Sequence, residues 1–339
     1  MVQIGYTLSS EEHGPGDLLL YGRIAEEVGF DFLTVSDHFH PWTSRQGQSP
    51  FVWSVLGGLS VKTERVDILT TVTCPTIRMH PAIVAQAAAT TACLLPDRFV
   101  LGLGTGENLN EHVVGMGWPH PHERLEMLEE AIGLIRQLWT GELVTEWTEH
   151  FTVDRARLYT IPEASPLIAV AASSPAAAKL AGRNGDALIS TAPDEDLVKA
   201  FRDAGGKGKP VYGQLTVCYG ADETKSKEEA LEWWPNTSVP GDLGVELAEP
   251  QQFEEVAKLI TADSVAEKVV CGPGTEPIRE KIGAFVDAGF DHVFFHQVGP
   301  RQEEFLEFAR KELLPAIDDQ WARSESRTAS GTATSSERQ

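Results

Sequence analysis

The chain has 339 residues, 42 % of them hydrophobic, and carries 50 Asp and Glu against 28 Lys and Arg, for a net charge of −22. Such a charge disfavours binding to nucleic acid or to an anionic membrane surface. No stretch approaches the roughly 20 apolar residues that a membrane helix needs.

Short apolar runs alternate with helical patterns along most of the chain. Strands are predicted at residues 2–8, 30–37, 66–75, 98–106, 166–173, 185–192, 210–220 and 290–299. Helices are predicted at residues 17–29, 54–63, 81–94, 124–139, 175–185, 195–205 and 303–317. Continuously apolar strands indicate parallel strands that are buried on both faces. We therefore expect an α/β fold with a closed (β/α)8 barrel, and a doubly wound open sheet is the alternative.

Two stretches interrupt this alternation. Residues 140–165 predict a small β excursion, and residues 221–274 contain the Pro/Gly-rich run WWPNTSVPGDLGVELAEP followed by a helix. Such insertions usually shape the mouth of a barrel's pocket. We expect residues 1–320 to form a single barrel domain, and the Ser/Thr-rich residues 321–339 to be a disordered tail.

Polar residues stand where the predicted strands end, beginning with VSDHFHPW (35–42). In a barrel the active site lies at the carboxyl ends of the strands. Residues expected to converge there are Asp37, His38, Thr71 to Thr73, Glu107, Ser173, Ser174 and His296. His38 is either structural or, beside Asp37 and opposite Glu107, one half of an acid/base pair.

The motif GLGTGE (102–107) invites a dinucleotide interpretation, which we reject. Its spacing is G-x-G-x-G, and Glu107 stands where it would repel a pyrophosphate. The glycines are instead expected to keep the strand end slim, so that a flat ring can lie against the backbone.

A metal site is not predicted. His38 and His40 are two residues apart, and His112, His120 and His122 cluster further along, but neither group has a recognisable ligand spacing. The four cysteines form no CxxC pair, and the N-terminal residues lack a signal-peptide pattern. Both observations favour free thiols in a cytoplasmic protein.

The run AVAASSPAAAKLAG (169–182) leads from a strand into a helix. Its small residues and two hydroxyls form either an anion-binding helix N-terminus or an ordinary N-cap.

Several of these stretches occur together in a known order: VSDHFHPW, TVTCPTIRMHPAIVAQA, DRFVLGLGTGENLNE, AASSPAAAKLAGRNGDA and DHVFFH. Between about residue 3 and about residue 317 the chain resembles the luciferase-like barrel superfamily. More closely, it resembles the branch typified by coenzyme F420-dependent glucose-6-phosphate dehydrogenase. The resemblance implies a luciferase-like TIM barrel and a deazaflavin cofactor, coenzyme F420, that accepts a hydride. A homodimer is expected.

The resemblance also assigns roles to residues. It implies that His38 is the base that removes the substrate's hydroxyl proton, that Glu107 is the catalytic acid, and that Trp42 lies beside the cofactor ring. Thr71–Val72 matches a cis non-proline peptide, and Ala172 to Ser174 match a phosphate-binding turn that often contains Gly-Gly. The expected cofactor-binding residues are Asp37, Thr71, Val72, Thr105, Asn110, Ala172, Ser173, Ser174, Ser190 and Thr191.

Three functions follow as hypotheses. The first is an F420-dependent dehydrogenase acting on an alcohol or sugar, the second is an FMN-dependent monooxygenase, and the third is a flavin-binding barrel without catalysis. The pairing of SDHF with GTGE favours the first.

The substrate is expected to be an unphosphorylated sugar or a secondary alcohol, and glucose 6-phosphate is the alternative. A phosphate dianion normally needs two or three cationic donors. TAPDED (191–196) and VPGDLGVELAEP (239–250) contain none, which leaves only Lys268. Trp42, with Trp233 or Trp234, would supply an apolar wall.

Overall fold

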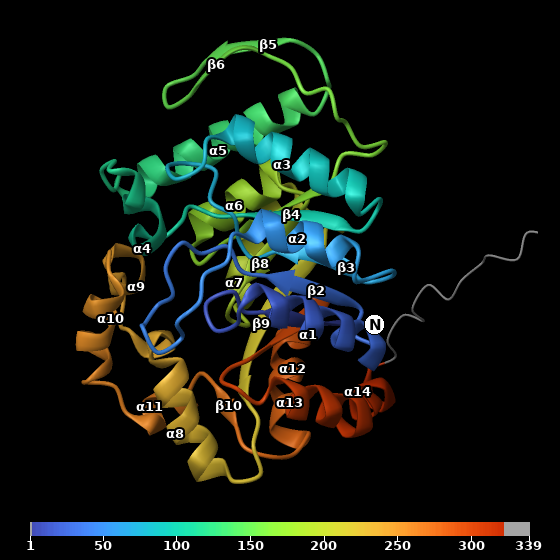
Figure 1. Ribbon diagram of the computed structural model, residues 1–339, viewed down its shortest axis with the longest axis vertical. Coiled ribbons are helices and arrows are strands. Elements are labelled where there is room, and N and C mark those ends of the chain that lie inside the picture. Colours follow the sequence, from blue (N-terminus) through green and yellow to red (C-terminus); the bar gives the residue numbers. More distant parts are fainter. Residues whose placement is uncertain (1, 322–339) are drawn as a thin grey trace, which may run out of the picture.

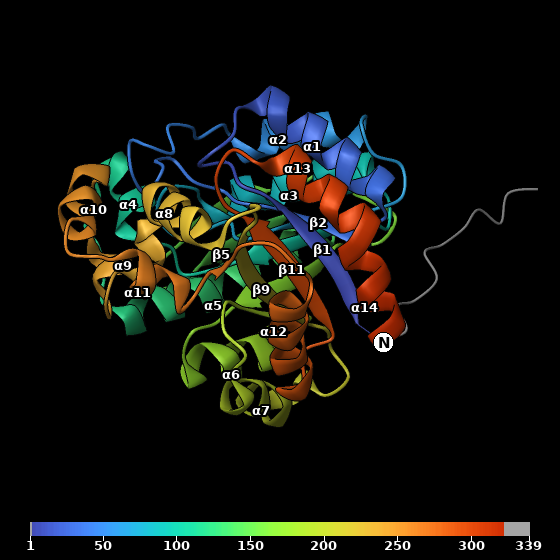
Figure 2. The same cartoon turned by 90° about the horizontal axis from the view of Figure 1, so that it is seen from below.

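The main sheet closes on itself. The computed structural model describes residues 2–321, and its main sheet has the strand order β10–β9–β11–β1–β2–β3–β4–β7–β8. An additional pairing of β8 with β9 closes eight of these parallel strands into a barrel (Figures 1 and 2). The barrel strands are β1 (Gln3–Leu8), β2 (Phe32–Val35), β3 (Asp67–Thr70), β4 (Phe99–Leu103), β7 (Leu167–Ala171), β8 (Ala187–Ser190), β9 (Val211–Cys218) and β11 (His292–Gln297). The predicted barrel is confirmed over the open sheet. The predicted tail, residues 321–339, lies outside the described residues except for its first residue, Trp321.

Helices surround this barrel. They are α1 (Pro15–Val28), α2 (Val52–Ser60), α3 (Pro81–Leu94), α5 (Pro121–Leu138), α6 (Pro175–Asn184), α7 (Glu195–Phe201), α12 (Glu276–Asp287), α13 (Gln302–Phe308) and α14 (Leu314–Gln320). The sequence patterns predicted all of these positions except α12. Across residues 2–321, no helix combines the length and apolarity required to span a bilayer.

The barrel strands are buried on both faces, which is why their sequences do not alternate. One cluster of side chains fills the barrel interior and consists of Phe32, Leu69, Val100, Ala169, Ala187, Ile189, Tyr212 and Phe294. A larger cluster lies between the strands and the surrounding helices. Each buried aliphatic or aromatic side chain contributes about 1.5–3 kcal/mol, so the two layers together hold the strand ends in place.

The first insertion is a β-hairpin of β5 (Val144–Trp147) and β6 (Thr152–Ala156), as predicted. Its turn is fastened to α5 by Glu130, whose carboxylate accepts hydrogen bonds from the Thr148 hydroxyl (2.7 Å) and the His150 N–H (3.1 Å). In Figure 1 the hairpin lies beyond α5 at the top of the molecule.

The second insertion lies beside α4 (Asn108–Glu111), at the side where the β4 strand ends (Figures 1 and 2). It consists of α8 (Glu223–Trp233), the short turn Pro235–Ser238, α9 (Leu243–Glu246), α10 (Pro250–Ala257), α11 (Ala262–Ala266) and β10 (Val270–Cys271). β10 pairs with β9 and so extends the barrel sheet by one short strand. This insertion is therefore positioned to form part of the wall around the strand ends.

A buried carboxylate fixes the turn that leads into β3. Glu26, on α1, accepts hydrogen bonds from the N–H groups of Glu64, Arg65 and Val66 at 2.6–3.0 Å. Burial raises the pKa of Glu26, but the backbone donors outweigh it, so the net pKa lies below the ordinary value. Its stabilising contribution is therefore present above the ordinary carboxyl pKa and is lost as the pH falls.

We predict that Glu26→Ala lowers the free energy of unfolding by about 1–3 kcal/mol at neutral pH, because three N–H groups lose their acceptor. The control is Glu27→Ala, which removes an exposed ion pair with Arg23 and should cost at most about 0.5 kcal/mol. Urea unfolding of both variants measures the difference, and equal losses would contradict the assigned role.

Candidate active site

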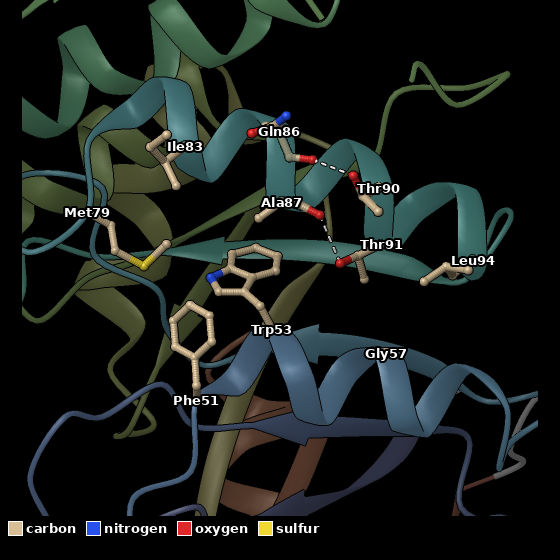
Figure 3. A pocket seen from close by; sticks show the side chains of 10 residues that line it. All are labelled: Phe51, Trp53, Gly57, Met79, Ile83, Gln86, Ala87, Thr90, Thr91 and Leu94. Atoms are coloured by element: carbon tan, nitrogen blue, oxygen red, sulfur yellow. Dashed lines mark hydrogen bonds between the residues drawn. The ribbon is translucent and has the colours of Figure 1, made fainter. Parts of the chain in front are cut away.

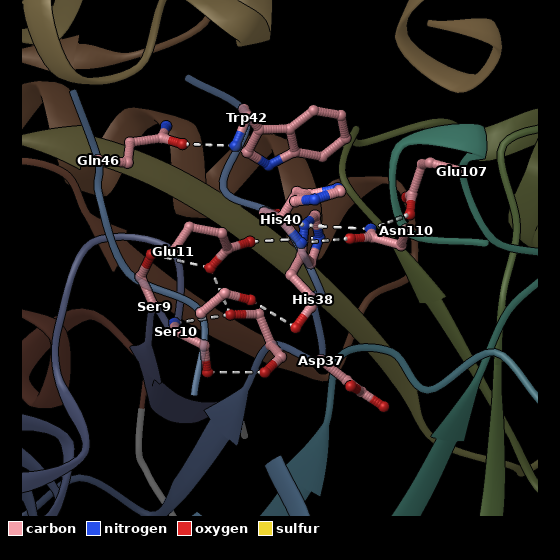
Figure 4. Close-up of polar contacts among 12 residues, drawn as sticks. Ser9, Ser10, Glu11, Asp37, His38, His40, Trp42, Gln46, Glu107 and Asn110 are labelled. Atoms are coloured by element: carbon pink, nitrogen blue, oxygen red, sulfur yellow. Dashed lines mark hydrogen bonds and ion pairs between the residues drawn. The ribbon is translucent and has the colours of Figure 1, made fainter. Parts of the chain in front are cut away.

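His38 lies directly after β2 and is paired with a buried acid that the sequence patterns did not single out. Its Nε2 is 3.3 Å from Oε1 of Glu11, whose side chain is 4 % exposed (Figure 4). The other oxygen of Glu11 accepts hydrogen bonds from the hydroxyls of Ser36 (2.5 Å) and Ser9 (3.1 Å). Burial raises the pKa of Glu11, but His38 and the Ser36 hydroxyl outweigh it and the net pKa falls below its usual value. A carboxylate thus faces the imidazole.

Asn110, on α4, joins His38 to Glu107. Its Oδ1 accepts hydrogen bonds from the N–H groups of Phe39 (2.9 Å) and His40 (3.2 Å), which fixes the orientation of the amide. The Nδ2 group therefore faces His38 Nδ1 and Glu107 Oε2, both at 3.2 Å (Figure 4). His38 Nδ1 is also 3.2 Å from the carbonyl oxygen of His40. When Nδ1 is unprotonated, it can accept a hydrogen bond from the Asn110 amide. When it is protonated, it can donate one to the His40 carbonyl oxygen.

Trp42 covers His38 from the side of the second insertion. The two ring centroids are 5.0 Å apart, and Phe253 of α10 meets the Trp42 ring edge-on at 5.2 Å. These side chains form an apolar wall, in which Trp42 packs against the cluster that contains the buried Trp234.

Asp37 is the anchor of a buried charge network. Its carboxylate accepts hydrogen bonds from the Thr73 hydroxyl (2.8 Å) and from Arg78 Nη2 (2.9 Å), and its side chain is fully buried. Arg78 also approaches Glu111 of α4, with its Nε 3.6 Å from Glu111 Oε1. Arg78 lies within the stretch TVTCPTIRMHP but was not predicted to have a role.

Glu111 is the carboxyl group of this network whose pKa is strongly raised. Burial raises its pKa to about 7, the nearby Glu107 and Asp37 add to the rise, and hydrogen bonding and charge from Arg78 oppose it. Among residues 2–321, Glu111 Oε1 and Arg78 Nε are buried atoms for which no hydrogen-bond partner is found. Glu111, one helical turn beyond Glu107, is therefore protonated at pH values below about 7.

A second histidine–glutamate pair lies at the end of β11. His296 Nε2 is 3.2 Å from Oε2 of Glu12, and the other Glu12 oxygen accepts the Gly299 N–H at 2.7 Å. Trp234 meets the His296 ring edge-on at 4.3 Å. The consecutive acids Glu11 and Glu12 thus pair with two different histidines, His38 and His296.

The segments that follow β3 and β4, residues 71–74 and 104–106, lie side by side, with the Gly104 N–H donating to the Thr73 carbonyl at 3.1 Å, and they are called the shelf below. The Thr71–Val72 peptide bond is cis, as the resemblance implied. A Cβ on Gly104 would meet the Val72 side chain at 2.6 Å. Gly106 has φ +81°, and a Cβ there would meet Cys74 Sγ at 2.7 Å. Glycine is therefore required at both positions for the backbone to pass close to Val72 and Cys74.

The turn before α6 carries the predicted small residues. Ser173 and Ser174 are exposed, whereas Ala172 is buried and its N–H donates to the Ile189 carbonyl at 2.9 Å. Ser174 is the N-cap of α6 and accepts from the Ala177 N–H at 3.4 Å. The capping interpretation therefore holds, and Ser173 also presents its hydroxyl at the surface.

The remaining predicted residues occupy varied surroundings. Ser190 is buried at the end of β8, Thr191 beside it is exposed, and Thr105 is half-buried between the two shelf glycines. Lys268 is exposed, and its ammonium group donates to the carbonyl oxygen of Thr237 at 2.8 Å.

The histidine cluster of the sequence does not assemble. His112 stacks on His40 with 5.7 Å between ring centroids, while His122 is exposed beside Glu126. Within residues 2–321, no group of three or more His, Cys, Asp or Glu side chains is arranged to hold a metal ion.

The chain is similar to proteins of one family over most of its length. A family model described as luciferase-like monooxygenase matches residues 2–292. A relative named F420-dependent glucose-6-phosphate dehydrogenase, from Microbacterium testaceum (strain StLB037), is 36 % identical over 95 % of this chain and 99 % of its own. A relative with the same name from Rhodococcus erythropolis (strain PR4 / NBRC 100887) is 35 % identical over 93 % of this chain and 98 % of its own.

Solved structures show the same similarity. An F420-dependent secondary alcohol dehydrogenase in complex with an F420-acetone adduct is 32 % identical, with a TM-score of 0.87 over 93 % of this chain and 99 % of that one. The coenzyme F420-dependent tetrahydromethanopterin reductase from Methanopyrus kandleri has a TM-score of 0.75 at 18 % identity, covering 93 % of this chain and 99 % of that one, and shares the fold.

We predict that Glu111→Gln changes how stability depends on pH. Because the pKa of Glu111 is raised to about 7 in the folded protein, its contribution is full below the ordinary carboxyl pKa and is lost as the pH rises through about 7. Glutamine mimics the protonated form, so the variant should gain about 3 kcal/mol relative to wild type between about pH 4.5 and about pH 8. Urea unfolding across this range measures the gain.

The matched control is Glu126→Gln, since the Glu126 side chain is 53 % exposed beside His122. Its pH dependence should parallel that of wild type. If the Glu111→Gln curve also ran parallel to wild type, Glu111 would be ionised throughout the range.

Proposed function

The chain belongs to the luciferase-like monooxygenase family, and on this premise we propose that it is a coenzyme F420-dependent dehydrogenase. Its reaction removes a hydride from the alcohol carbon of a small neutral substrate. The observation that carries the proposal is His38, held between the Glu11 carboxylate and the Asn110 amide next to Glu107. The names of the relatives and of the structural neighbour support the same cofactor.

The residues around the shelf fit a flat deazaflavin. The Thr71–Val72 backbone would take one face of the ring, and the glycines at 104 and 106 let the neighbouring strand end pack closely against Val72 and Cys74 beneath it. The exposed Ser173 and the N-terminus of α6 would take the anionic part of the cofactor. When bound, the deazaflavin supplies a ring carbon that accepts a hydride.

His38 takes up the proton of the substrate hydroxyl. Its Nδ1 is the receiving atom, since Nε2 already faces the Glu11 carboxylate. On protonation, Nδ1 exchanges the Asn110 donor for the His40 carbonyl acceptor, both at 3.2 Å. Glu11 stabilises the resulting imidazolium, because a buried carboxylate at 3.3 Å favours the charged ring.

Glu107 is the acid of the pair. Asn110 holds one of its oxygens, so the carboxyl group stays on the same side as His38. Glu111, one turn further along α4, holds a proton below about pH 7 and keeps the negative charge near Glu107 low. Glu107 and Glu111 would therefore manage protons beside the base His38.

The substrate is unphosphorylated, and a secondary alcohol fits best. Glu11, Asp37, Glu107 and Glu111 place carboxyl groups around the site, while Arg78 is already bonded to Asp37. A phosphate dianion would meet repulsion without the cationic donors that normally fix it.

Two further observations support a neutral substrate. The ammonium group of Lys268 is bonded to the Thr237 carbonyl. The half-buried Trp42, supported by the cluster that contains the buried Trp234, offers an apolar wall to a small alcohol. Glucose 6-phosphate, the substrate that the relatives' names indicate, is therefore the second candidate.

The active protein is a homodimer that pairs through α2 and α3. A groove of about 310 Å³ runs between these helices and is lined mainly by apolar side chains (Figure 3). Phe51, Ile83 and Leu94 on its rim are 54 %, 55 % and 50 % exposed. These exposed side chains gather around one groove, and an identical face on a second copy would cover them.

The protein acts in the cytoplasm. All four cysteines lie within residues 2–321 as free thiols, and Cys93 is exposed. An exposed free thiol suits a reducing compartment.

We predict that His38→Ala lowers kcat by roughly 100-fold or more, because a general base contributes typically about 10²–10⁴-fold. Its affinity for F420 should change little, because the imidazole contacts Glu11 and Asn110 rather than the shelf. The control, His122→Ala, alters an exposed histidine and should match wild type. Fluorescence titration and steady-state kinetics measure both quantities; a variant retaining more than about a tenth of the wild-type rate would remove His38 from the base role.

We predict a higher kcat/KM for simple secondary alcohols than for glucose 6-phosphate, with unphosphorylated glucose as the matched sugar. The carboxylates around the site disfavour the phosphate, and the tryptophan wall favours an apolar group. Steady-state assays that follow F420 absorbance compare the three substrates. A clear preference for glucose 6-phosphate would mean that other residues hold a phosphate and that the substrate assignment is wrong.

A further inference from the structure

Gln46 connects the loop that carries His38 and Trp42 to the second insertion. The residue is buried, with only 3 % of its surface exposed. Oε1 accepts hydrogen bonds from the N–H groups of Trp42 (2.8 Å) and Thr43 (3.3 Å). Nε2 donates to the carbonyl oxygen of Trp233 (2.9 Å) and to Asn236 Oδ1 (3.2 Å). The backbone partners on both sides fix which end of the amide faces which segment.

The loop depends on such external bonds. Residues 36–51, between β2 and α2, contain no helix or strand, so no ladder of backbone hydrogen bonds holds them. Gln46 binds the backbone N–H of Trp42, and the centroid of the Trp42 ring lies 5.0 Å from that of the His38 ring (Figure 4). Movement of this backbone would therefore move the ring away from the base.

The neighbouring polar contacts between the same two segments are exposed, although the Trp42 ring also packs on the buried Phe253. Arg45 pairs with Glu232 at 2.7 Å, with side chains 50 % and 55 % exposed, and its guanidinium lies 3.9 Å from the Trp233 ring centroid. Exposed ion pairs contribute little to holding two segments together, whereas a buried amide that loses its partners leaves polar backbone groups unsatisfied. Among these polar connections, Gln46 is thus the strongest.

We propose that Gln46 is a positioning residue that sets the place of Trp42 by joining the catalytic loop to the second insertion. Through this connection, the two tryptophans of the apolar wall, Trp42 and Trp234, are held as one unit. The proposal rests on the proposed function for its kinetic consequence, but the connection itself has a readout that does not require turnover.

The kinetic test uses Gln46→Met, which keeps the side-chain length and removes all four hydrogen bonds. We expect kcat/KM with a secondary alcohol to fall roughly 10- to 100-fold, since small displacements of positioned groups cost up to about 10²-fold. The dissociation constant of F420 should change less than about twofold. Arg45→Ala is the control, and it should stay within about twofold of wild type in both measurements.

A double-mutant cycle separates positioning of Trp42 from general damage. In a Trp42→Ala background, Gln46→Met should have almost no further effect on kcat/KM, because the ring that Gln46 positions is already absent. If Gln46→Met lowered kcat/KM equally in both backgrounds, its effect would not pass through Trp42, and the proposal would be overturned.

Hydrogen exchange on the free protein tests the connection directly. Gln46→Met should speed exchange of the Trp42 and Thr43 amides at least tenfold while Arg45→Ala leaves them unchanged; unchanged exchange in Gln46→Met would refute the connection. If wild-type protein reduced no F420 with any alcohol while Gln46→Met still accelerated these amides, the proposed function would fail and the positioning of Trp42 by Gln46 would stand.

Discussion

Closure of the parallel barrel is the constraint on which the rest of the structure depends. Once β8 pairs with β9, every barrel strand runs in the same direction around a closed ring, and all the carboxyl ends meet at one rim. Glu11, His38 and Glu107 follow three different strands and are brought within contact of one another or of a shared partner. The two-sided burial of these strands stabilises the ring, so the geometry of the site rests on the core.

The rim concentrates acidic groups, and each needs compensation because an unpaired buried charge is costly. Glu11 has His38 and two serine hydroxyls, Asp37 has Arg78 and Thr73, and Glu111 is compensated by binding a proton below about pH 7. Under the proposed function, the same arrangement would favour a neutral substrate over a phosphorylated one. The acidity of the rim thus links the stability of the site to its choice of substrate.

Much of the fold could be predicted from the sequence, because continuous apolar strands and amphipathic helices are local patterns. The rim residues His38, Glu107 and Trp42 were also predicted, since their motifs stand at strand ends. Side-chain partners could not be predicted in this way. In SSEEH, Glu11 and Glu12 look equivalent, yet one faces His38 and the other His296. Gln46 lies in the polar run TSRQGQS, where no periodicity distinguishes it from Gln48, and its role depends on a segment almost 190 residues away.

The central claim is that this rim transfers a hydride from an alcohol to F420 without oxygen. The most direct measurement is a single-turnover reaction under anaerobic conditions, with the protein in excess over oxidised F420 and a secondary alcohol present. The account predicts that F420 loses its absorbance at its namesake wavelength while ketone forms in equal amount. Absence of bleaching with every alcohol and sugar tested, together with oxygen uptake when FMN and a reductant are supplied, would contradict it.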